Sequence, residues 1–445
     1  MEPATAGILD VLQGAAALVK GITHPTLPLQ ANLTRIPSVP LPRSQHSISI
    51  VKGRAYIFGG ETAPGHLADN DMYIIILPSS GVLDADYTSK PARAANGLDD
   101  VPGPRKGHTA VVIGDTIYVF GGEGNNVSDE KGRVWAYHTV SSTWSFLDST
   151  PGTLSPSHRV GHTSASADLP RARFVTYQEN SPQQPADPSK NVPEPPTDDT
   201  WGTIFVVGGR EISSGNLATD ALAFDVKTRT WSNIPSPPGI PREGASLVLA
   251  GTKLYYFGGK GIETFASGAL QYLDVAPVFA HAEGGTTPLT SGWGWQEVLH
   301  QESSDLSAPQ ARSNAGIVEV TTGQGRQYLL IVGGQAENSN CLDDIWTFQL
   351  PSEHASAAAT KDAIRTTMRR DTHEATWAEA LYGFVDAKGE EEGEIPGKPK
   401  CGIGNRNQFA IARGTEVDGA TCVIWGGIDS LGNTLANGWL VTVSR

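Results

Sequence analysis

Six arginines recur at one phased position in the chain, each a short distance before a strand-like segment that ends in a glycine pair. They are Arg43, Arg105, Arg159, Arg242, Arg312 and Arg406. A guanidinium group presents a planar fork of donors that matches carboxylates, phosphates and acidic peptides. If these side chains surround a common depression, they predict an anion-binding ring. The competing interpretation is structural, with each arginine bridging neighbouring repeats through backbone carbonyls.

The residues that directly follow the glycine pairs form a second set of candidate groups. They are Glu61, Glu123, Arg210, Lys260 and Gln335. Arg210, Lys260 and Gln335 would extend the ligand-binding set of arginines. Glu61 and Glu123 would partly offset the positive charge of that set. In an enzyme, Glu61 or Glu123 would be the general acid or base, while the arginines would stabilise developing negative charge.

Histidines and aspartates also occur at repeated positions. The histidines that follow an arginine by three residues are His46, His108 and His162, and the other repeats place Ala245, Ala315 and Phe409 there. A position that accepts alanine or phenylalanine predicts packing. His158 and His162 lie in a loop-to-strand region, where their spacing would not direct both side chains to one metal. We therefore expect no metal site and no cofactor. The aspartates expected to cap turns before strands are Asp71, Asp220 and Asp344.

The elements that must position these groups are visible as a repeat. Six aromatic or β-branched runs end in a glycine pair: AYIFGG at Gly60, IYVFGG at Gly122, IFVVGG at Gly209, LYYFGG at Gly259, LLIVGG at Gly334 and CVIWGG at Gly427. An arginine-led strand precedes each run and an aromatic strand follows it. Most units end in a tryptophan strand, which contains Trp144, Trp231, Trp295 or Trp377. Four such strands form one twisted antiparallel blade, whose faces are buried only by stacking on neighbouring blades.

This pattern resembles the kelch repeat, and the resemblance covers residues 31–445. It implies an all-β fold, a kelch β-propeller, and says less about function. The chain also resembles plant specifier proteins, which are kelch propellers that act on unstable glucosinolate products. It is similar to them in having a propeller without other recognisable domains and in the positions of its arginines. It lacks the ExxxDxxxH iron pattern of that group, and it shows no copper constellation of the galactose-oxidase type.

The repeat count predicts six blades with a closure by the N-terminus. The sixth unit ends at GWLVTVSR without a tryptophan strand, while ANLTRIPSVPLPR before Arg43 matches RTWSNIPSPPGIPR before Arg242. The N-terminal segment should therefore supply the outer strand of blade 6, which leaves no exposed blade edge. The predicted boundaries are a short helix and lead-in at 1–30, the closing strand at 31–42, and blades at 43–104, 105–158, 159–241, 242–311, 312–403 and 404–445.

Blade geometry sorts the connections onto two faces. Loops from the glycine-pair strand to the aromatic strand, and from the tryptophan strand to the next arginine, emerge on what we call the first face. The other two loop types emerge on the second face. Insertions expected on the second face are 169–200, 276–292 and 353–375, the last with helical composition from Ala355 to Met368. The acidic stretch 388–400 is expected to be a solvated loop on the first face.

Composition limits the partners and the compartment. The 445 residues include 50 glycines and 30 prolines, which argues against a mainly helical protein. A net charge of −14 makes nucleic acid a poor partner. No apolar run reaches the roughly 20 residues that span a bilayer, so we expect no membrane partner. The three cysteines lack CxxC spacing and predict reduced thiols in a cytoplasmic protein; they are Cys341, Cys401 and Cys422. We expect the protein to be a monomer.

Two functions remain open from the sequence. The first is a binding protein whose arginine-lined face takes up an acidic protein segment or another anionic ligand. The second is a metal-independent enzyme of isomerase, cyclase or lyase type that acts on a small reactive metabolite of specialised metabolism. A closed depression of a few hundred cubic ångströms with apolar walls would favour the small molecule, and a shallow open face would favour a protein.

Overall fold

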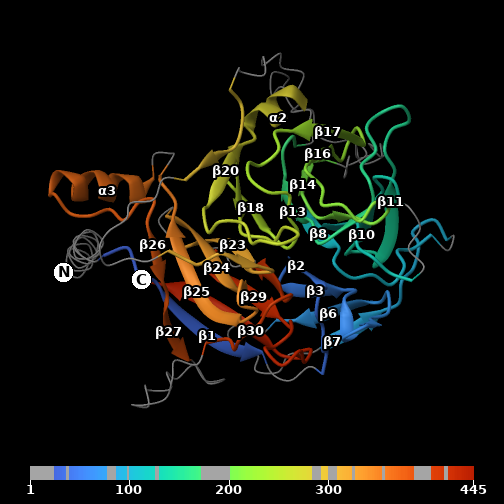
Figure 1. The fold of residues 1–445 in the computed structure, drawn as a ribbon, viewed down its shortest axis with the longest axis horizontal. Coiled ribbons are helices and arrows are strands. Elements are labelled where there is room, and N and C mark those ends of the chain that lie inside the picture. The colour runs from blue at the N-terminus through green and yellow to red at the C-terminus, as the bar shows by residue number, and fades with distance from the viewer. Residues whose placement is uncertain are drawn as a thin grey trace, which may run out of the picture.

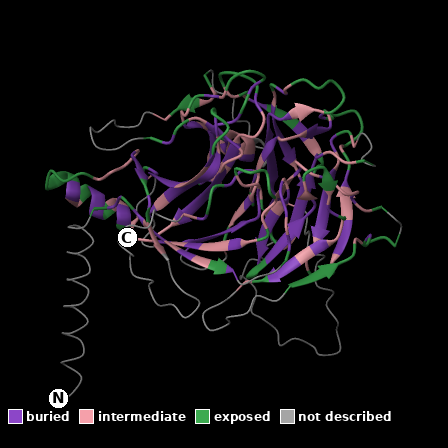
Figure 2. Cartoon of the chain, turned by 60° about the horizontal axis from the view of Figure 1, so that its bottom comes forward, coloured by how far each residue is buried: buried purple, intermediate pink, exposed green. Residues whose placement is uncertain are grey.

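The computed structural model describes residues 25–36, 40–77, 87–97, 100–125, 130–171, 201–282, 292–298, 308–322, 326–352, 356–384, 402–414 and 419–445. Six antiparallel sheets surround a central axis and form a β-propeller (Figure 1). The strands are largely buried, and exposed residues concentrate in the connecting loops (Figure 2). The predicted six-bladed, all-β propeller is confirmed.

The strands within each blade follow chain order from the axis outward. Blade 1 contains β2 (Ser47–Val51), β3 (Arg54–Phe58), β6 (Met72–Ile76) and β7 (Tyr87–Lys90). Blade 2 contains β8 (Thr109–Ile113), β9 (Thr116–Phe120), β10 (Val134–His138) and β11 (Thr143–Leu147). Blade 3 contains β13 (Thr163–Ala167), β14 (Thr203–Val207), β16 (Ala221–Asp225) and β17 (Thr230–Ile234).

The remaining blades follow the same order. Blade 4 contains β18 (Ser246–Ala250), β19 (Lys253–Phe257), β20 (Gln271–Asp274) and β21 (Gln296–Glu297). Blade 5 contains β23 (Gly316–Thr321), β24 (Gln327–Ala336), β25 (Cys341–Gln349) and β26 (Trp377–Glu379). Blade 6 begins with β28 (Ala410–Arg413), β29 (Thr421–Trp425) and β30 (Gly438–Ser444). Short strands on the first face are β4 (Glu61–Ala63), β5 (His66–Leu67), β12 (Arg159–Val160), β15 (Arg210–Glu211) and β22 (Arg312–Ser313).

The N-terminal strand closes blade 6. Strand β1 (Gln30–Ile36) is antiparallel to β30, with Gln30 opposite Ser444 and Ile36 opposite Gly438. Beyond it, β27 (Leu381–Phe384) pairs in parallel with β1 and adds a fifth strand that the sequence did not predict. The outward edge of β1 is therefore covered, which removes a template for pairing with another chain.

The glycine pairs bring adjacent blades into contact. In every blade the second glycine donates its N–H to the backbone carbonyl of the arginine in the next blade, as from Gly60 to Arg105 at 2.8 Å and from Gly427 to Arg43 at 2.8 Å. The first glycine has a positive φ, 62° at Gly59, and a Cβ there would lie 2.5 Å from the Arg105 carbonyl. Glycine is thus required by both conformation and space.

Aromatic side chains complete the contacts between blades. Trp144 packs on Phe58 of the preceding blade with ring centroids 4.9 Å apart. His108 packs edge-on against the same Phe58 at 5.3 Å, and its Nε2 lies 2.9 Å from Ser47 Oγ. The equivalent contact joins His162 to Phe120. The prediction that these histidines pack is confirmed.

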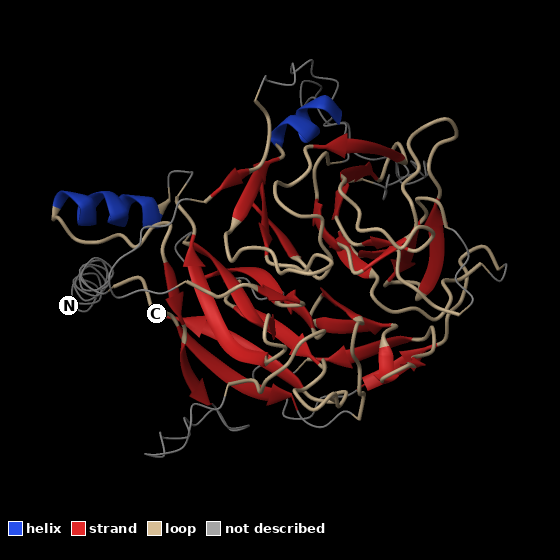
Figure 3. Ribbon diagram, viewed as in Figure 1, coloured by secondary structure: helices blue, strands red, loops and turns tan. Residues whose placement is uncertain are grey.

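Within the described ranges, two helices lie outside the sheets (Figure 3). Helices α2 (Ala276–Ala282) and α3 (Ala357–Thr367) both occupy second-face connections, and α3 confirms the helix expected near residues 355–368. No helix in the described ranges is long and apolar enough to cross a membrane. Cys341 and Cys422 are buried free thiols. The helix expected at the N-terminus, Cys401, the acidic stretch 388–400 and most of 169–200 lie outside the described residues.

Candidate functional site

A two-residue ladder in each blade positions the side chains of the first face. The residue after the phased arginine pairs with the residue after the glycine pair, as in Lys106 with Glu123, whose backbones exchange two hydrogen bonds of 2.9 Å. The equivalent pairs are Ser44 with Glu61, Val160 with Arg210, Glu243 with Lys260, Ser313 with Gln335 and Asn407 with Ile428. The repeat therefore places one pair of side chains per blade around the mouth of the propeller.

Inside these ladders, backbone hydrogen bonds run from blade to blade around the axis. The N–H of Gly107 donates to the carbonyl of Gln45 at 2.9 Å, and Gly161 donates to Gly107 at 2.9 Å. The series continues through Gly244 to Asn314, whose N–H donates at 2.7 Å. These residues have positive φ values. The mouth of the propeller is therefore lined by peptide groups that are hydrogen-bonded to one another.

The phased arginines direct their guanidinium groups into the protein. Each of the six is between 0 and 5% exposed. Arg105 donates to the Gly121 carbonyl at 3.0 Å and forms two bonds of 2.9 and 2.8 Å to the Glu130 carboxylate. Arg159 pairs in the same way with Asp220, and Arg312 with Asp344. Asp220 and Asp344 were expected to cap turns, and their carboxylates instead hold arginines.

Three other arginines have neutral partners. Arg43 donates to the Pro42 carbonyl and lies 4.8 Å from the Tyr73 ring. Arg242 donates to Gln271, and Arg406 donates to the Gly426 carbonyl and to Asn437. Ligand contact by the six arginines stays a prediction, and the contacts described here are all with the protein itself. The ladder positions contribute further charges to the first face.

The Arg105–Glu130 pair gives a first testable prediction. Burial acts to raise the pKa of Glu130, but the bonds from Arg105 outweigh it and lower the pKa. Glu130→Gln keeps the shape and removes the charge that compensates a fully buried guanidinium, so we expect a loss of about 3 kcal/mol in unfolding free energy. Chemical denaturation at pH 7 measures it.

The control for this prediction is Asp148→Asn nearby. Asp148 also binds an arginine, Arg133, at 2.6 Å, but its side chain is 53% exposed. We expect a loss below about 1 kcal/mol there, because exposed pairs contribute little. Equal losses in the two variants would contradict the assignment of Arg105 as a buried structural cation.

Blades 1 and 2 carry a cluster centred on a lysine. Lys106 Nζ lies 2.8 Å from Glu61 Oε1 and 3.5 Å from Glu123 Oε1. Burial acts to lower the pKa of Lys106, but these two carboxylates outweigh it and raise the pKa. Glu61 is 4% exposed and also accepts from Gln45 at 3.4 Å, whereas 45% of the Glu123 side chain is exposed. The two glutamates proposed as acid or base therefore share one lysine.

Blades 3, 4 and 5 carry the other exposed charges. Arg210 forms a bidentate pair with Glu243 of the next blade, with bonds of 3.0 and 2.6 Å, which raises the pKa of Arg210. Lys260 is exposed and lies 5.6 Å from the Phe265 ring. Gln335 donates to the Ser339 carbonyl at 3.3 Å. No carboxylate in the described part of the chain lies within ion-pair distance of Lys260.

The sequence analysis missed two charged members of this face, Lys106 and Glu243. Both follow a phased arginine directly, so the same repeat alignment that selected the arginines contained the signal. With them, blades 1 and 2 contribute Glu61, Lys106 and Glu123, while blades 3 and 4 contribute Arg210, Glu243 and Lys260. At the ladder positions the face is therefore net negative over blades 1 and 2, its negative side, and net positive over blades 3 and 4, its positive side.

Exposed isoleucines flank the positive side. Ile212 follows the ladder of blade 3 and is 44% exposed, Ile240 precedes blade 4 and is 38% exposed, and Ile262 is 79% exposed. Gly261 packs closely against this group, since a Cβ there would lie 2.8 Å from Ile240 Cδ1. Apolar side chains next to exposed cations are typical of a surface that binds a protein.

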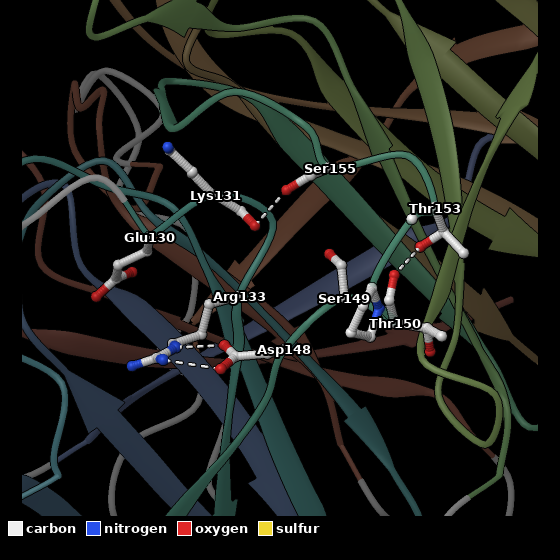
Figure 4. Close-up of a pocket in the computed structure, with 10 residues that line it drawn as sticks. Glu130, Lys131, Arg133, Asp148, Ser149, Thr150, Thr153 and Ser155 are labelled. Carbon is white, nitrogen blue, oxygen red and sulfur yellow. Dashed lines mark hydrogen bonds and ion pairs between the residues drawn. The ribbon is translucent and has the colours of Figure 1, made fainter.

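The cavities in the described first-face loops include a larger and a smaller one. The larger, of about 400 Å³, is bounded by residues 130–133 and 148–155 of blade 2. Figure 4 shows the Arg133–Asp148 pair on one wall and the hydroxyl side chains Ser149, Thr150 and Ser155 nearby. The smaller, of about 160 Å³, lies between blades 3 and 4. The larger cavity has charged and hydroxyl walls, so it does not match the apolar depression expected for a small-molecule enzyme.

Comparisons with known proteins agree with the fold. A family model described as the KLHDC2/KLHL20/DRC7 Kelch-repeats domain matches residues 30–170 and 199–391. The chain is 35% identical over 230 residues, half of its length, to an N-(sulfonatooxy)prop-2-enimidothioate sulfolyase of Thlaspi arvense. It is 35% identical over 130 residues, or 28% of its length, to the Rho GTPase-activating protein gacHH of Dictyostelium discoideum. It is 24% identical over 264 residues, or 56% of its length, to human host cell factor 1.

The matched regions are parts of these relatives. They cover 53% of the sulfolyase, 8% of the GTPase-activating protein and 10% of host cell factor 1. The family match spans most of the propeller, and the chain belongs to the kelch-repeat family.

Proposed function

We propose that this kelch propeller is a binding module that takes up an acidic segment of a partner protein on its first face. The binding surface consists of Arg210, Lys260 and Gln335 together with Ile240 and Ile262, over blades 3 to 5. The observation that carries the proposal is Lys260, an exposed cation without an ion-pair partner in the described residues, beside an isoleucine that is 79% exposed. An acidic segment with apolar residues would complement both features.

Charge on the opposite side of the face orients the segment. At the ladder positions, Glu61 and Glu123 outnumber Lys106 in blades 1 and 2, while Arg210 and Lys260 outnumber Glu243 in blades 3 and 4, so we expect the acidic segment to lie over blades 3 and 4. The carboxylates of the segment would then meet Lys260 and Arg210, and its apolar residues would cover Ile240 and Ile262. Because the charges are partly exposed, salt should weaken the association.

The test uses peptides selected on the protein from a random displayed library. We expect enrichment of aspartate, glutamate and apolar residues, and at least tenfold weaker binding of the selected peptides to Lys260→Glu, measured by fluorescence anisotropy. The matched control is Lys227→Glu, in the turn between β16 and β17 on the second face, which should bind as tightly as the natural protein. Enrichment of basic peptides, or equal binding to Lys260→Glu, would overturn the proposal.

A second candidate function is favoured by the sulfolyase relative. We propose as the alternative a lyase-type activity on a sulfonated small molecule, with Glu123 or Glu61 as acid or base beside Lys106. Sulfate release from N-(sulfonatooxy)prop-2-enimidothioate tests it directly, and Glu123→Gln should slow the release at least tenfold. Release that stops when a chelator is added would contradict a metal-independent reaction, and absence of release would remove this alternative.

A further inference from the structure

Arg242 differs from the carboxylate-paired arginines in the partner that its blade provides. Arg105, Arg159 and Arg312 each meet an acidic side chain, whereas Arg242 Nη2 donates to the neutral amide oxygen of Gln271 at 2.6 Å. Arg242 is only 5% exposed. Within the described residues its Nε has no hydrogen-bond acceptor. Blade 4 thus buries a guanidinium whose charge and donors are incompletely matched.

The lack of a carboxylate partner does not by itself distinguish Arg242 from the other phased arginines, because Arg406 lacks one too. Arg406 also has no carboxylate, and burial lowers its pKa to about 10. Its Nη1 donates to the Gly426 carbonyl and to Asn437 Oδ1, its Nε donates to the Gly404 carbonyl, and its Nη2 donates to the Ile403 carbonyl. Every nitrogen of that guanidinium has an oxygen acceptor. Arg242 lacks this complete set.

A cavity of about 160 Å³ lies beside the incompletely matched guanidinium. Its walls include Arg242, Tyr256, Ser236 and Asp220. The Arg242 guanidinium carbon lies 4.3 Å from the centre of the Tyr256 ring, which offsets part of the positive charge. Asp220 contributes no free negative charge, because its carboxylate is bound by Arg159 at 2.6 and 3.0 Å.

A buried cation is costly unless an anion or several acceptors compensate it. The cavity offers space for a planar group that could accept from the fork of Arg242, as Glu130 does for Arg105 in blade 2. A carboxylate fits both the size of the cavity and the geometry of the guanidinium.

We propose that this cavity is a carboxylate pocket, in which Arg242 receives the side chain of one aspartate or glutamate of the acidic segment. The inference rests on the proposed function and adds the residue that confers specificity. The pocket adjoins the proposed surface, since Ile240 lines the cavity and packs against Gly261, the residue after Lys260. A segment lying over Lys260 and Ile262 would therefore pass the entrance.

The decisive variant is Gln271→Glu, which supplies an internal carboxylate to Arg242 and so occupies the guanidinium. Because it adds the kind of pair that Arg105 and Arg312 already have, we expect the variant to fold and to melt at or above the temperature of the natural protein. The matched control is Asn437→Asp, which adds the same charge beside Arg406, where all donors already have acceptors.

The first measurement uses acetate alone, with chloride and sulfate as comparison anions. A ligand that binds only the folded state raises the melting temperature further as its concentration rises, with a logarithmic dependence at concentrations above Kd. We expect acetate to raise the melting temperature of the natural protein and of Asn437→Asp by several degrees, and to leave Gln271→Glu unchanged relative to chloride. An equal shift in Gln271→Glu, no shift in the natural protein, or protection by sulfate but not acetate would overturn the carboxylate pocket.

The second measurement uses one selected acidic peptide and its versions with single glutamate-to-glutamine or aspartate-to-asparagine changes. One such change should weaken binding to the natural protein at least tenfold and have no effect on binding to Gln271→Glu. In one outcome, acidic peptides bind while Gln271→Glu still loses affinity for the single-change peptides as the natural protein does. That result would contradict the carboxylate pocket and leave the proposed binding function standing. If no acidic peptide binds while acetate still protects, the binding function is wrong and the pocket stands.

Discussion

A protein that begins at Arg43 is expected to lose cooperative folding, because it lacks the strand that closes blade 6. Strand β1 and the residue before it bury Leu29, Leu33 and Ile36, which are at most 2% exposed, and the strand pairs on both edges. Burial of a large apolar side chain contributes about 1.5–3 kcal/mol. The summed loss is on the order of the whole stability of a typical protein. Thermal unfolding followed by near-ultraviolet circular dichroism measures it.

Two variants on the same strand supply the control. Leu33→Ala removes a side chain that is 1% exposed and should cost about 2–5 kcal/mol, whereas Arg35→Ala alters an exposed position and should cost less than about 1 kcal/mol. A synthetic peptide of residues 25–42 added to the truncated protein should restore part of the melting temperature. A truncated protein that melts with the full chain would show that β1 does not close the ring.

Acidification from pH 6.5 to pH 5 is expected to destabilise the protein through its packed histidines. Burial, with the nearby charges of Arg43 and Arg105, lowers the pKa of His46 and His108 to about 3. Burial also lowers the pKa of His162 well below its usual value. The unfolded chain binds protons below pH 6.5 while the folded protein does not, so unfolding becomes easier as the pH falls. Each histidine then costs about 2 kcal/mol at pH 5.

Denaturant titrations at pH 7, 6 and 5 measure this effect, and His108→Phe isolates one histidine. Phenylalanine is the residue that blade 6 places at the equivalent position, Phe409. The variant should lose about one third of the pH dependence, whereas His66→Gln at an exposed position should keep it all. Carboxylates with a lowered pKa, such as Glu130, lose their contribution only below about pH 4.5, outside this window. A pH slope unaffected by His108→Phe would refute the histidine origin.

The positions of the candidate groups followed from the sequence, but their environments did not. Alignment of the glycine pairs placed Glu61, Arg210 and Lys260 at one ladder position, because each blade repeats the same backbone path. It did not place Glu130 next to Arg105, since the loop between them differs in length and composition from blade to blade. The monomeric state and the cytoplasmic location stay predictions.

The sequence by itself determined the number of blades, their strand order and the closure by the N-terminus. These features depend on local signals, a β-branched run, a glycine pair and a tryptophan strand, which recur in every unit and need no knowledge of distant contacts. Only the tertiary structure decided which arginines pair with carboxylates and which one lies beside a cavity. The reason is that the carboxylate partners lie 25 to 61 residues away along the chain, as with Glu130 and Asp220, and only folding brings them to the guanidinium groups.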